Sequence, residues 1–280
     1  MHIHWPLVVS TTCQRVGLGM YLCALFANAA FGLALPLNFV ALGTLVFLGI
    51  GGIASIFHLQ SPSRFFNAFS NLKSHLTQEA LITPLLGIAL VACGLNGLLF
   101  DAGPASGPVE AVTGVLALAF LVCTGLAYQM RSRPAWNTGF IVALFLLTAA
   151  EAGGIAAMVT CLATAAAAPA LLSAMAAACF VACVATQAAY THRMRTVGYG
   201  VDVDARKGPY RTAYLAWLAF GVVVAGIGLT AAVAFSSIAC ALVALAGSAA
   251  GIAAWTVLFF KGAHKVKMFP MYPVDLNLDM

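Results

Sequence analysis

The chain has 280 residues, of which 62% are hydrophobic and only 8% are charged, and its formal net charge at pH 7 is +5. Soluble domains carry roughly 25% charged residues, because a folded surface in water needs them. This composition excludes an ordinary water-soluble protein. We therefore expect an integral membrane protein without a nucleic-acid partner.

Eight segments are long and apolar enough to cross a bilayer as helices. Such a helix needs about 20 predominantly apolar residues, and it pairs its own backbone polar groups. The apolar runs do not alternate with polar residues as the strands of a membrane barrel do. We predict an all-α, eight-transmembrane-helix bundle that forms a single domain over residues 1–280. The predicted spans are residues 6–31, 37–58, 79–100, 109–130, 138–163, 169–191, 213–235 and 238–260.

Basic residues gather on one side of these spans. All 13 Lys and Arg, Arg15 included, are assigned to the N-terminal start, to the loops after the second, fourth and sixth spans, or to the C-terminal tail. By the positive-inside rule, both termini and these loops face the cytoplasm. The same face would suit an acidic soluble partner.

The chain offers few metal ligands in useful positions. Its eight cysteines lie mostly within the spans and include no CxxC pair, so we expect them to be structural. None of the six histidines lies deep within a predicted span, and no span carries two. A haem held by two histidines needs paired ligands at matching depth, and an iron–sulfur cluster needs clustered cysteines. We therefore expect no metal, haem or iron–sulfur cluster in this chain.

Three polar residues point to chemistry in or beside the membrane. Glu151 lies near the middle of the fifth span, where a carboxylate is costly and is a functional candidate by default; the alternative is a protonated side chain bonded to a neighbouring helix. His58 ends the second span and Glu79 opens the third, so the loop between them brings both to one interface. A histidine beside a carboxylate suits proton transfer, although a polar residue that ends a helix at the interface is also ordinary.

A longer motif surrounds His58. The stretch FHLQSPSRFFNAFSNLKSHLTQEA, residues 57–80, resembles the signature of the membrane anchor subunit of anaerobic dimethyl sulfoxide reductase, the DmsC family, which is related to the NrfD and polysulfide reductase anchors. HWPLV at residues 4–8 and RPAWNTGF at residues 133–140 match shorter family motifs. Gln60 stands where the family has Gly, and His4 stands where it has Glu. With chain length and span count in agreement, the resemblance covers essentially the whole chain.

The resemblance implies a multi-pass anchor in a bacterial inner membrane that binds and oxidises menaquinol. Its electrons would pass to a partner subunit with iron–sulfur clusters of the 4Fe–4S type, and from there to a molybdopterin subunit that reduces an S-oxide or N-oxide. His58 and Glu79 correspond to the family's quinol site, with His58 as proton acceptor and Glu79 orienting it or carrying the proton away. Ser61 and Arg64 match the turn that follows His58. Trp136 either lines the same site or anchors the membrane interface.

Two alternatives stay open on the sequence. An anchor of the NrfD and polysulfide reductase type would keep the quinol chemistry but serve another respiratory complex. A secondary transporter would show internal repeats and broken helices; AAEAGG around Glu151 is the only candidate break, and the two halves show no convincing similarity. Orientation is open too, because the basic loops predict a cytoplasmic face for His58, whereas many complexes of the family export their catalytic subunit.

Overall fold

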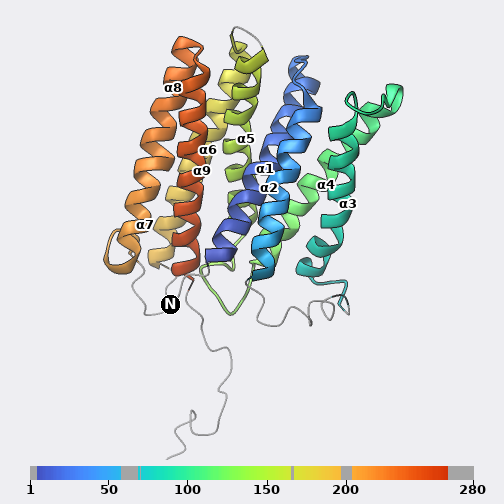
Figure 1. Cartoon of the computed structure of the whole chain (residues 1–280). Helices are drawn as coiled ribbons and strands as arrows, with labels where there is room; N and C mark the ends of the chain where they lie inside the picture. The colour runs from blue at the N-terminus through green and yellow to red at the C-terminus, as the bar shows by residue number, and fades with distance from the viewer. Residues whose placement is uncertain (1–4, 58–68, 70, 165–166, 197–203, 264–280) are drawn as a thin grey trace, which may run out of the picture.

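The computed structural model describes residues 5–57, 69, 71–164, 167–196 and 204–263. Within these residues the chain is built of helices and contains no strand (Figure 1), which confirms the predicted all-α class. The elements are α1 (Trp5–Phe31), α2 (Leu37–Phe57), α3 (His75–Leu95), η2 (Gly103–Ala105), α4 (Ser106–Ala127), α5 (Phe140–Thr164), α6 (Ala170–Thr196), η3 (Gly208–Tyr210), α7 (Arg211–Ala216), η4 (Trp217–Val224), α8 (Ala225–Phe235) and α9 (Ile238–Lys261).

Among the described residues, seven helical segments are long and apolar enough to cross a membrane. The seventh predicted span is a continuous helical segment, Gly208–Phe235, in which η4 is a π-helix. The first predicted span forms α1, which has the length but not the hydropathy, because polar residues interrupt its first half. The prediction of eight apolar spans is therefore confirmed for seven, and α1 is a more polar helix.

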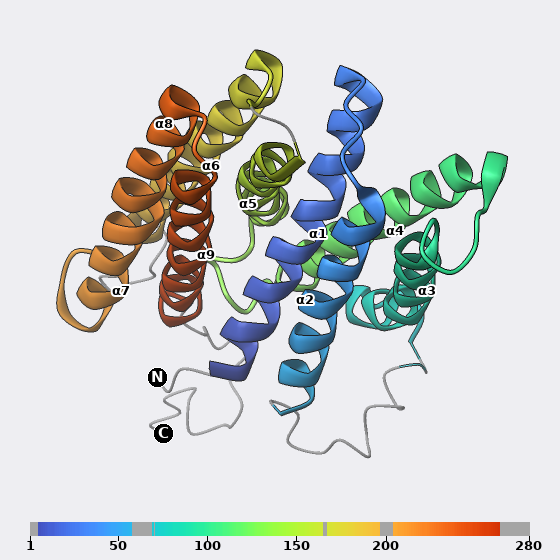
Figure 2. The same cartoon turned by 45° about the horizontal axis from the view of Figure 1, so that its top comes forward.

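The position of α1 explains how it can be polar. It packs against α2, α4, α5 and α9, so other helices rather than lipid cover most of its surface. Figures 1 and 2 show α1 and α5 in the middle of the bundle, with α2, α3 and α4 on one side and α6, α8 and α9 on the other. Large apolar side chains such as Ile53, Leu85 and Ile227 are exposed on outer helices, as expected of surfaces that contact lipid.

Glycines allow the central helices to touch backbone to backbone. A Cβ atom on Gly19 of α1 would overlap the Ala149 carbonyl of α5, and one on Gly153 of α5 would overlap the Gly19 carbonyl. In the same way, a Cβ on Gly251 of α9 would overlap the backbone of Gly221 in the π-helix. Such close approach is the usual role of small residues in membrane helices. It holds the polar side chains of these helices at short distances from one another.

One end of the bundle, named here the basic end, carries the basic loops and lies at the bottom of Figure 1. It is the end where α1, α3 and α5 begin and where α2, α6 and α9 finish. The described basic residues at this end are Lys73, Arg131, Arg133, Arg193, Arg195, Arg206, Lys207, Arg211 and Lys261.

Arg15 does not belong to that group. It lies about 15 Å along α1 from Trp5, at 1.5 Å of rise per residue, and its residue surface is only 1% exposed. The prediction that Arg15 marks the cytoplasmic interface is wrong, because the polar groups of neighbouring helices hold this cation inside the bundle.

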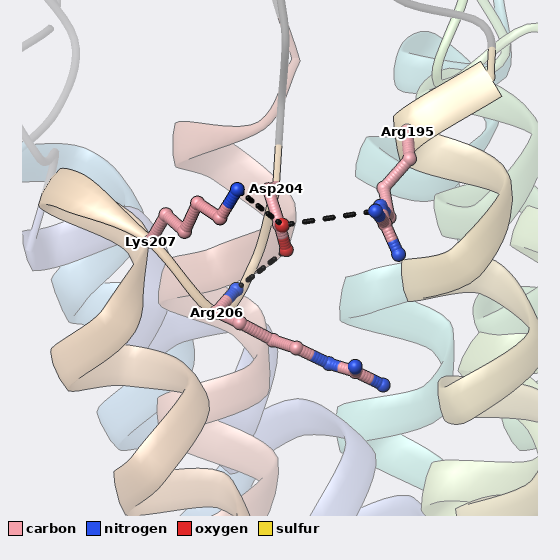
Figure 3. A network of polar contacts seen from close by, with 4 residues as sticks. All are labelled: Arg195, Asp204, Arg206 and Lys207. Carbon is pink, nitrogen blue, oxygen red and sulfur yellow. Dashed lines mark hydrogen bonds and ion pairs between the residues drawn. The ribbon is translucent and has the colours of Figure 1, made fainter.

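A carboxylate organises the basic end beside α7 (Figure 3). Asp204 Oδ2 lies 3.8 Å from Arg195 Nη2 at the end of α6 and 3.9 Å from Lys207 Nζ, and Asp204 Oδ1 accepts the Arg206 backbone N–H at 3.0 Å. That hydrogen bond and the neighbouring cations lower the pKa of Asp204 from its ordinary value. The contacts tie the segment that leads into α7 to the last turn of α6.

Candidate functional site

The predicted quinol site belongs to the basic end, where α2 finishes and α3 begins. His58, Ser61 and Arg64 lie outside the described residues, so their predicted roles stay predictions. The structure places the other two members of the predicted set, Glu79 and Trp136.

Local hydrogen bonds fix the first turn of α3. The helix begins at His75, and the backbone carbonyl of Ser74 accepts the Gln78 N–H at 3.0 Å. Gln78 Oε1 lies 3.0 Å from His75 Nδ1, and Gln78 Nε2 donates to the Leu72 carbonyl at 3.3 Å. These contacts hold the helix start in place and thereby set the position of Glu79, the next residue.

The Glu79 side chain lies between α3 and α4, where the residue is half-buried. The Thr124 side chain, whose hydroxyl donates to the Phe120 carbonyl at 2.9 Å, lies beside its carboxyl group. Tyr128, one turn further along the chain towards the basic end, interacts electrostatically with the same group, as does Cys123. The arrangement presents a proton-accepting group, supported by hydroxyl side chains, near the basic end of the bundle.

Trp136 lies in the loop between α4 and α5 and is buried. Its Nε1 donates to the Phe259 carbonyl at 3.3 Å, and its ring stacks on Phe259 with centroids 4.9 Å apart. The guanidinium carbon of Arg133 lies 4.6 Å from the indole centroid, and the Tyr128 ring meets the indole edge-on at 5.3 Å. Trp136 thus secures the loop to the end of α9, and Tyr128 connects it to Glu79.

Glu151 lies at the centre of the bundle, only 2% exposed. Ser248 Oγ of α9 donates to Glu151 Oε1 at 2.7 Å, and Cys183 of α6 lies close to the same carboxyl group. The sequence left open that Glu151 is a protonated side chain bonded to a neighbouring helix. The Ser248 contact supplies the hydrogen bond which that interpretation requires.

Arg15 is the buried cation that sequence reasoning missed. Its Nε donates to the Thr11 carbonyl at 2.8 Å, its Nη1 donates to Thr148 Oγ1 at 3.3 Å, and its Nη2 donates to Thr256 Oγ1. The guanidinium carbon lies 4.8 Å from the centroid of the Phe145 ring. The signal that could have found it is its position well inside the first predicted span, where charged residues are rare.

Arg15 and Glu151 interact without touching. Direct ion pairs in the described part of the chain are found only at Asp204, while Arg15 and Glu151 attract each other electrostatically over a longer distance. The interior therefore contains a guanidinium group and a carboxyl group that each hydrogen-bond to uncharged groups.

These side chains form two polar clusters, an outer one and an inner one. The outer cluster, between α3 and α4, consists of Gln78, Glu79, Thr124 and Tyr128. The inner cluster, between α1, α5, α6 and α9, consists of Arg15, Thr148, Glu151, Cys183, Ser248 and Thr256. Among the described residues, no three His, Cys, Asp or Glu side chains are grouped so that they could hold a metal ion.

Comparison with known proteins gives one family. The family model described as DMSO reductase anchor subunit (DmsC) matches residues 1–259, nearly the whole chain. No curated protein compared with the chain matches it. The matched range contains His58 and both polar clusters.

Proposed function

This chain belongs to the DMSO reductase anchor subunit family, and from that premise we propose that it oxidises menaquinol beside the start of α3. Electrons pass from the quinol to an iron–sulfur subunit and then to a molybdopterin subunit that reduces an S-oxide or N-oxide. The setting is a bacterial inner membrane. The family match favours this function over an anchor of another respiratory complex and over a transporter.

The observation that carries the proposal is the environment of Glu79. Its carboxyl group lies between two membrane helices, near the basic end, beside the Thr124 side chain and within electrostatic range of Tyr128. The segment that leads into α3 carries His58, Ser61 and Arg64. A lipid-soluble quinol that approaches between helices would meet a proton acceptor here.

Oxidation of a quinol releases two electrons and two protons. His58, as neutral imidazole, accepts the proton of a quinol hydroxyl as the electrons leave, because only the neutral ring can act as a base. Glu79 orients that ring and takes the proton onward, while Thr124 and Tyr128 hold the Glu79 carboxyl group in place. Ser61 and Arg64 bind the polar side of the head group.

The basic end also suits the docking of the electron acceptor. It carries a surplus of Lys and Arg over acidic residues, and opposite charge on a partner speeds association and fixes its orientation. With this partner seated beside α3, its first iron–sulfur cluster receives electrons directly from the quinol. By the positive-inside rule, this end faces the cytoplasm.

The test uses membranes that contain the assembled complex. Oxidation of a menaquinol analogue is compared in wild type, His58→Ala, Glu79→Gln and the control Glu110→Gln at matched subunit levels. Glu110 is a suitable control because it lies in the first turns of α4, at the opposite end of the bundle. Activity with an artificial donor that reduces the soluble subunits directly reports whether those subunits remain intact.

We expect quinol oxidation to fall by roughly 10²-fold or more in His58→Ala and Glu79→Gln, since a positioned acid or base contributes at least that much. Glu110→Gln keeps the wild-type rate, and all variants keep the artificial-donor activity. Wild-type quinol oxidation in both His58→Ala and Glu79→Gln would show that the site lies elsewhere.

A further inference from the structure

Two buried donors beside the inner cluster have no acceptor within the described part of the chain. They are Gln187 Nε2 on α6 and Trp255 Nε1 on α9, in residues that are 2% and 1% exposed. Buried N–H groups nearly always have a partner, either in the protein or in ordered water. Each of these donors therefore requires an acceptor that the described side chains and backbone do not supply.

Both donors lie on the stretches of α6 and α9 that run from the neighbours of Glu151 towards the basic end. Gln187 is one turn beyond Cys183 on α6, and Trp255 is two turns beyond Ser248 on α9. Ser248 donates to the Glu151 carboxyl group, and Cys183 lies close to it. The two donors thus lie beyond these neighbours of Glu151, in the direction of the basic end.

A ring contact joins these two stretches within an aromatic cluster that also contains Trp217 and Phe259. Tyr190, on the turn after Gln187, has its ring centroid 5.6 Å from that of Trp255. Gln187 Oε1 accepts the Trp217 Nε1–H at 2.7 Å, so the amide oxygen is occupied and the amide N–H groups are turned elsewhere. Trp217 opens the π-helix η4, and interruptions of this kind in α-helices are frequent at functional sites.

The side chains around the two donors determine which small molecule can satisfy them. Gln187, Trp255 and Arg15 contribute donors, and Glu151 contributes the acceptor. Arg15 and Glu151 attract each other at a distance that leaves no direct ion pair between them. Water, which accepts two hydrogen bonds and donates two, satisfies the donors and the carboxylate together, and buried waters typically occupy such polar sites.

We propose that the space between α5, α6 and α9 holds exchangeable water bound by Gln187 Nε2 and Trp255 Nε1, and that this water connects Glu151 with the basic end. Glu151 is then a reversible proton-binding site: its carboxylate takes a proton from a hydronium ion, which leaves a neutral carboxyl group and water. This function is independent of menaquinol binding.

The groups that face Glu151 are consistent with reversible proton binding. Arg15 from α1 favours the carboxylate form, and the Ser248 hydroxyl of α9 donates to it. From α6, Cys183 lies close to the carboxyl group and Cys179 lies within electrostatic range. One cation and uncharged donors therefore surround a single acid, and protonation leaves Arg15 as the charge that water must solvate.

The test is infrared difference spectroscopy of the assembled complex in lipid, recorded over a range of pH in H2O and D2O. The C=O stretch of a protonated Glu151 is identified by its loss in Glu151→Gln. If that variant does not assemble, Ser248→Ala identifies the band instead, because loss of the hydrogen bond shifts its frequency. Gln187→Leu removes the amide donor together with the acceptor of Trp217 Nε1–H, and Trp255→Phe removes the indole N–H together with one ring. Gln129→Leu is the control, since Gln129 Nε2 is satisfied by the Thr138 carbonyl at 3.0 Å, outside this space.

The expected result is a Glu151 band that titrates with pH and shifts promptly in D2O. Gln187→Leu and Trp255→Phe should each slow the deuterium shift by roughly two- to tenfold, the equivalent of one hydrogen bond, and Gln129→Leu should leave it unchanged. A Glu151 group that does not titrate, a band that resists D2O for hours, or wild-type exchange in both Gln187→Leu and Trp255→Phe would overturn the proposal.

Discussion

The outer and inner clusters each contain one carboxyl group in contact with a hydroxyl group from another helix, yet they differ in everything around it. Glu79 is half-buried between two helices on one side of the bundle. Glu151 is enclosed by central helices and faces a buried cation, Arg15. The outer cluster can thus be reached from the side by a lipid-soluble molecule, while the inner one is reached only by species as small as water and protons.

The two clusters should therefore differ in what their substitutions affect, folding stability or quinol oxidation. Arg15 makes hydrogen bonds that join α1 to α5 and to α9, so the inner cluster connects elements far apart in the chain. The outer cluster connects only α3 and α4, which follow each other in sequence. Substitutions in the inner cluster should therefore act first on folding, and those in the outer cluster should act first on quinol oxidation.

The largest effect is expected from Arg15→Met. Methionine keeps much of the volume but removes the cation that faces Glu151 and the Arg15 hydrogen bonds to Thr148 and Thr256. Each hydrogen bond of a charged group contributes about 1.5–3 kcal/mol. We expect a large fall in the melting temperature of the purified chain and in its amount in membranes. Arg15→Met/Glu151→Gln should regain much of the loss, because both charges are gone. An Arg15→Met protein as stable as wild type would mean that the pair has no structural role.

A smaller loss is expected where α1 and α5 touch. Gly19→Ala places a methyl group against the Ala149 carbonyl, and such overpacking costs about 1–3 kcal/mol. Gly87→Ala in α3 is the matched control, because nothing lies within 4 Å of its added Cβ; it should stabilise the protein by about 0.5–1 kcal/mol through helix propensity. Thermal unfolding of both variants measures the difference. Equal stability of the two would show that the central helices can move apart freely.

From the sequence, one residue of each cluster stood out, Glu79 and Glu151, and the partners of both were missed, for physical reasons. Glu79 lies beside a motif and at the end of an apolar run, and both features are visible in one dimension. Glu151 stands out as a carboxylate in an apolar segment. The partners of Arg15, by contrast, come from helices more than 130 residues away in the chain, at separations of 133 and 241 residues, and a single sequence does not reveal such pairings.

Composition located some helix ends closely and others poorly, since the predicted span 79–100 is the helix His75–Leu95 and the span 109–130 is Ser106–Ala127. The apolar run 37–58 became Leu37–Phe57 and the run 238–260 became Ile238–Lys261. The π-helix Trp217–Val224 had no sequence signal, because its side chains are as apolar as those of the α-helix that continues it. The sequence predicts Arg15 of α1 at the membrane interface, but burial among helices explains the polar residues of this helix. Hydropathy locates spans but does not tell which span lies at the centre.

Thr124→Val tests whether the outer cluster acts on chemistry more than on folding. The change removes the hydroxyl group that lies beside the Glu79 carboxyl group and donates to the Phe120 carbonyl, at nearly constant shape. We expect an effect equivalent to one hydrogen bond, about 1 kcal/mol, or about fivefold in quinol oxidation rate. Thr113→Val on the same helix is the matched control: its hydroxyl bonds the Val109 carbonyl at 2.8 Å, far from Glu79. Both variants should lose similar stability, and only Thr124→Val should slow quinol oxidation. An equal slowing in Thr113→Val would assign the effect to packing of α4.

The smallest effect is expected at Asp204, which belongs to neither cluster and ties α6 to the segment before α7. Because the folded state lowers the pKa of Asp204, mainly through the Arg206 N–H, its contribution to stability is complete above the unfolded-state pKa of about 3.9. It is lost as the pH falls through the lower folded-state value.

Asn in its place can still accept the Arg206 N–H but cannot attract Arg195 or Lys207. Asp204→Asn should therefore lower the melting temperature slightly at neutral pH and converge with wild type in acid, whereas Asp101→Asn, at the opposite end of the bundle, should leave the wild-type pH dependence unchanged. If the wild-type and Asp204→Asn curves stay parallel down to about pH 3, the carboxylate charge does not hold this segment, and the backbone hydrogen bond alone accounts for its position.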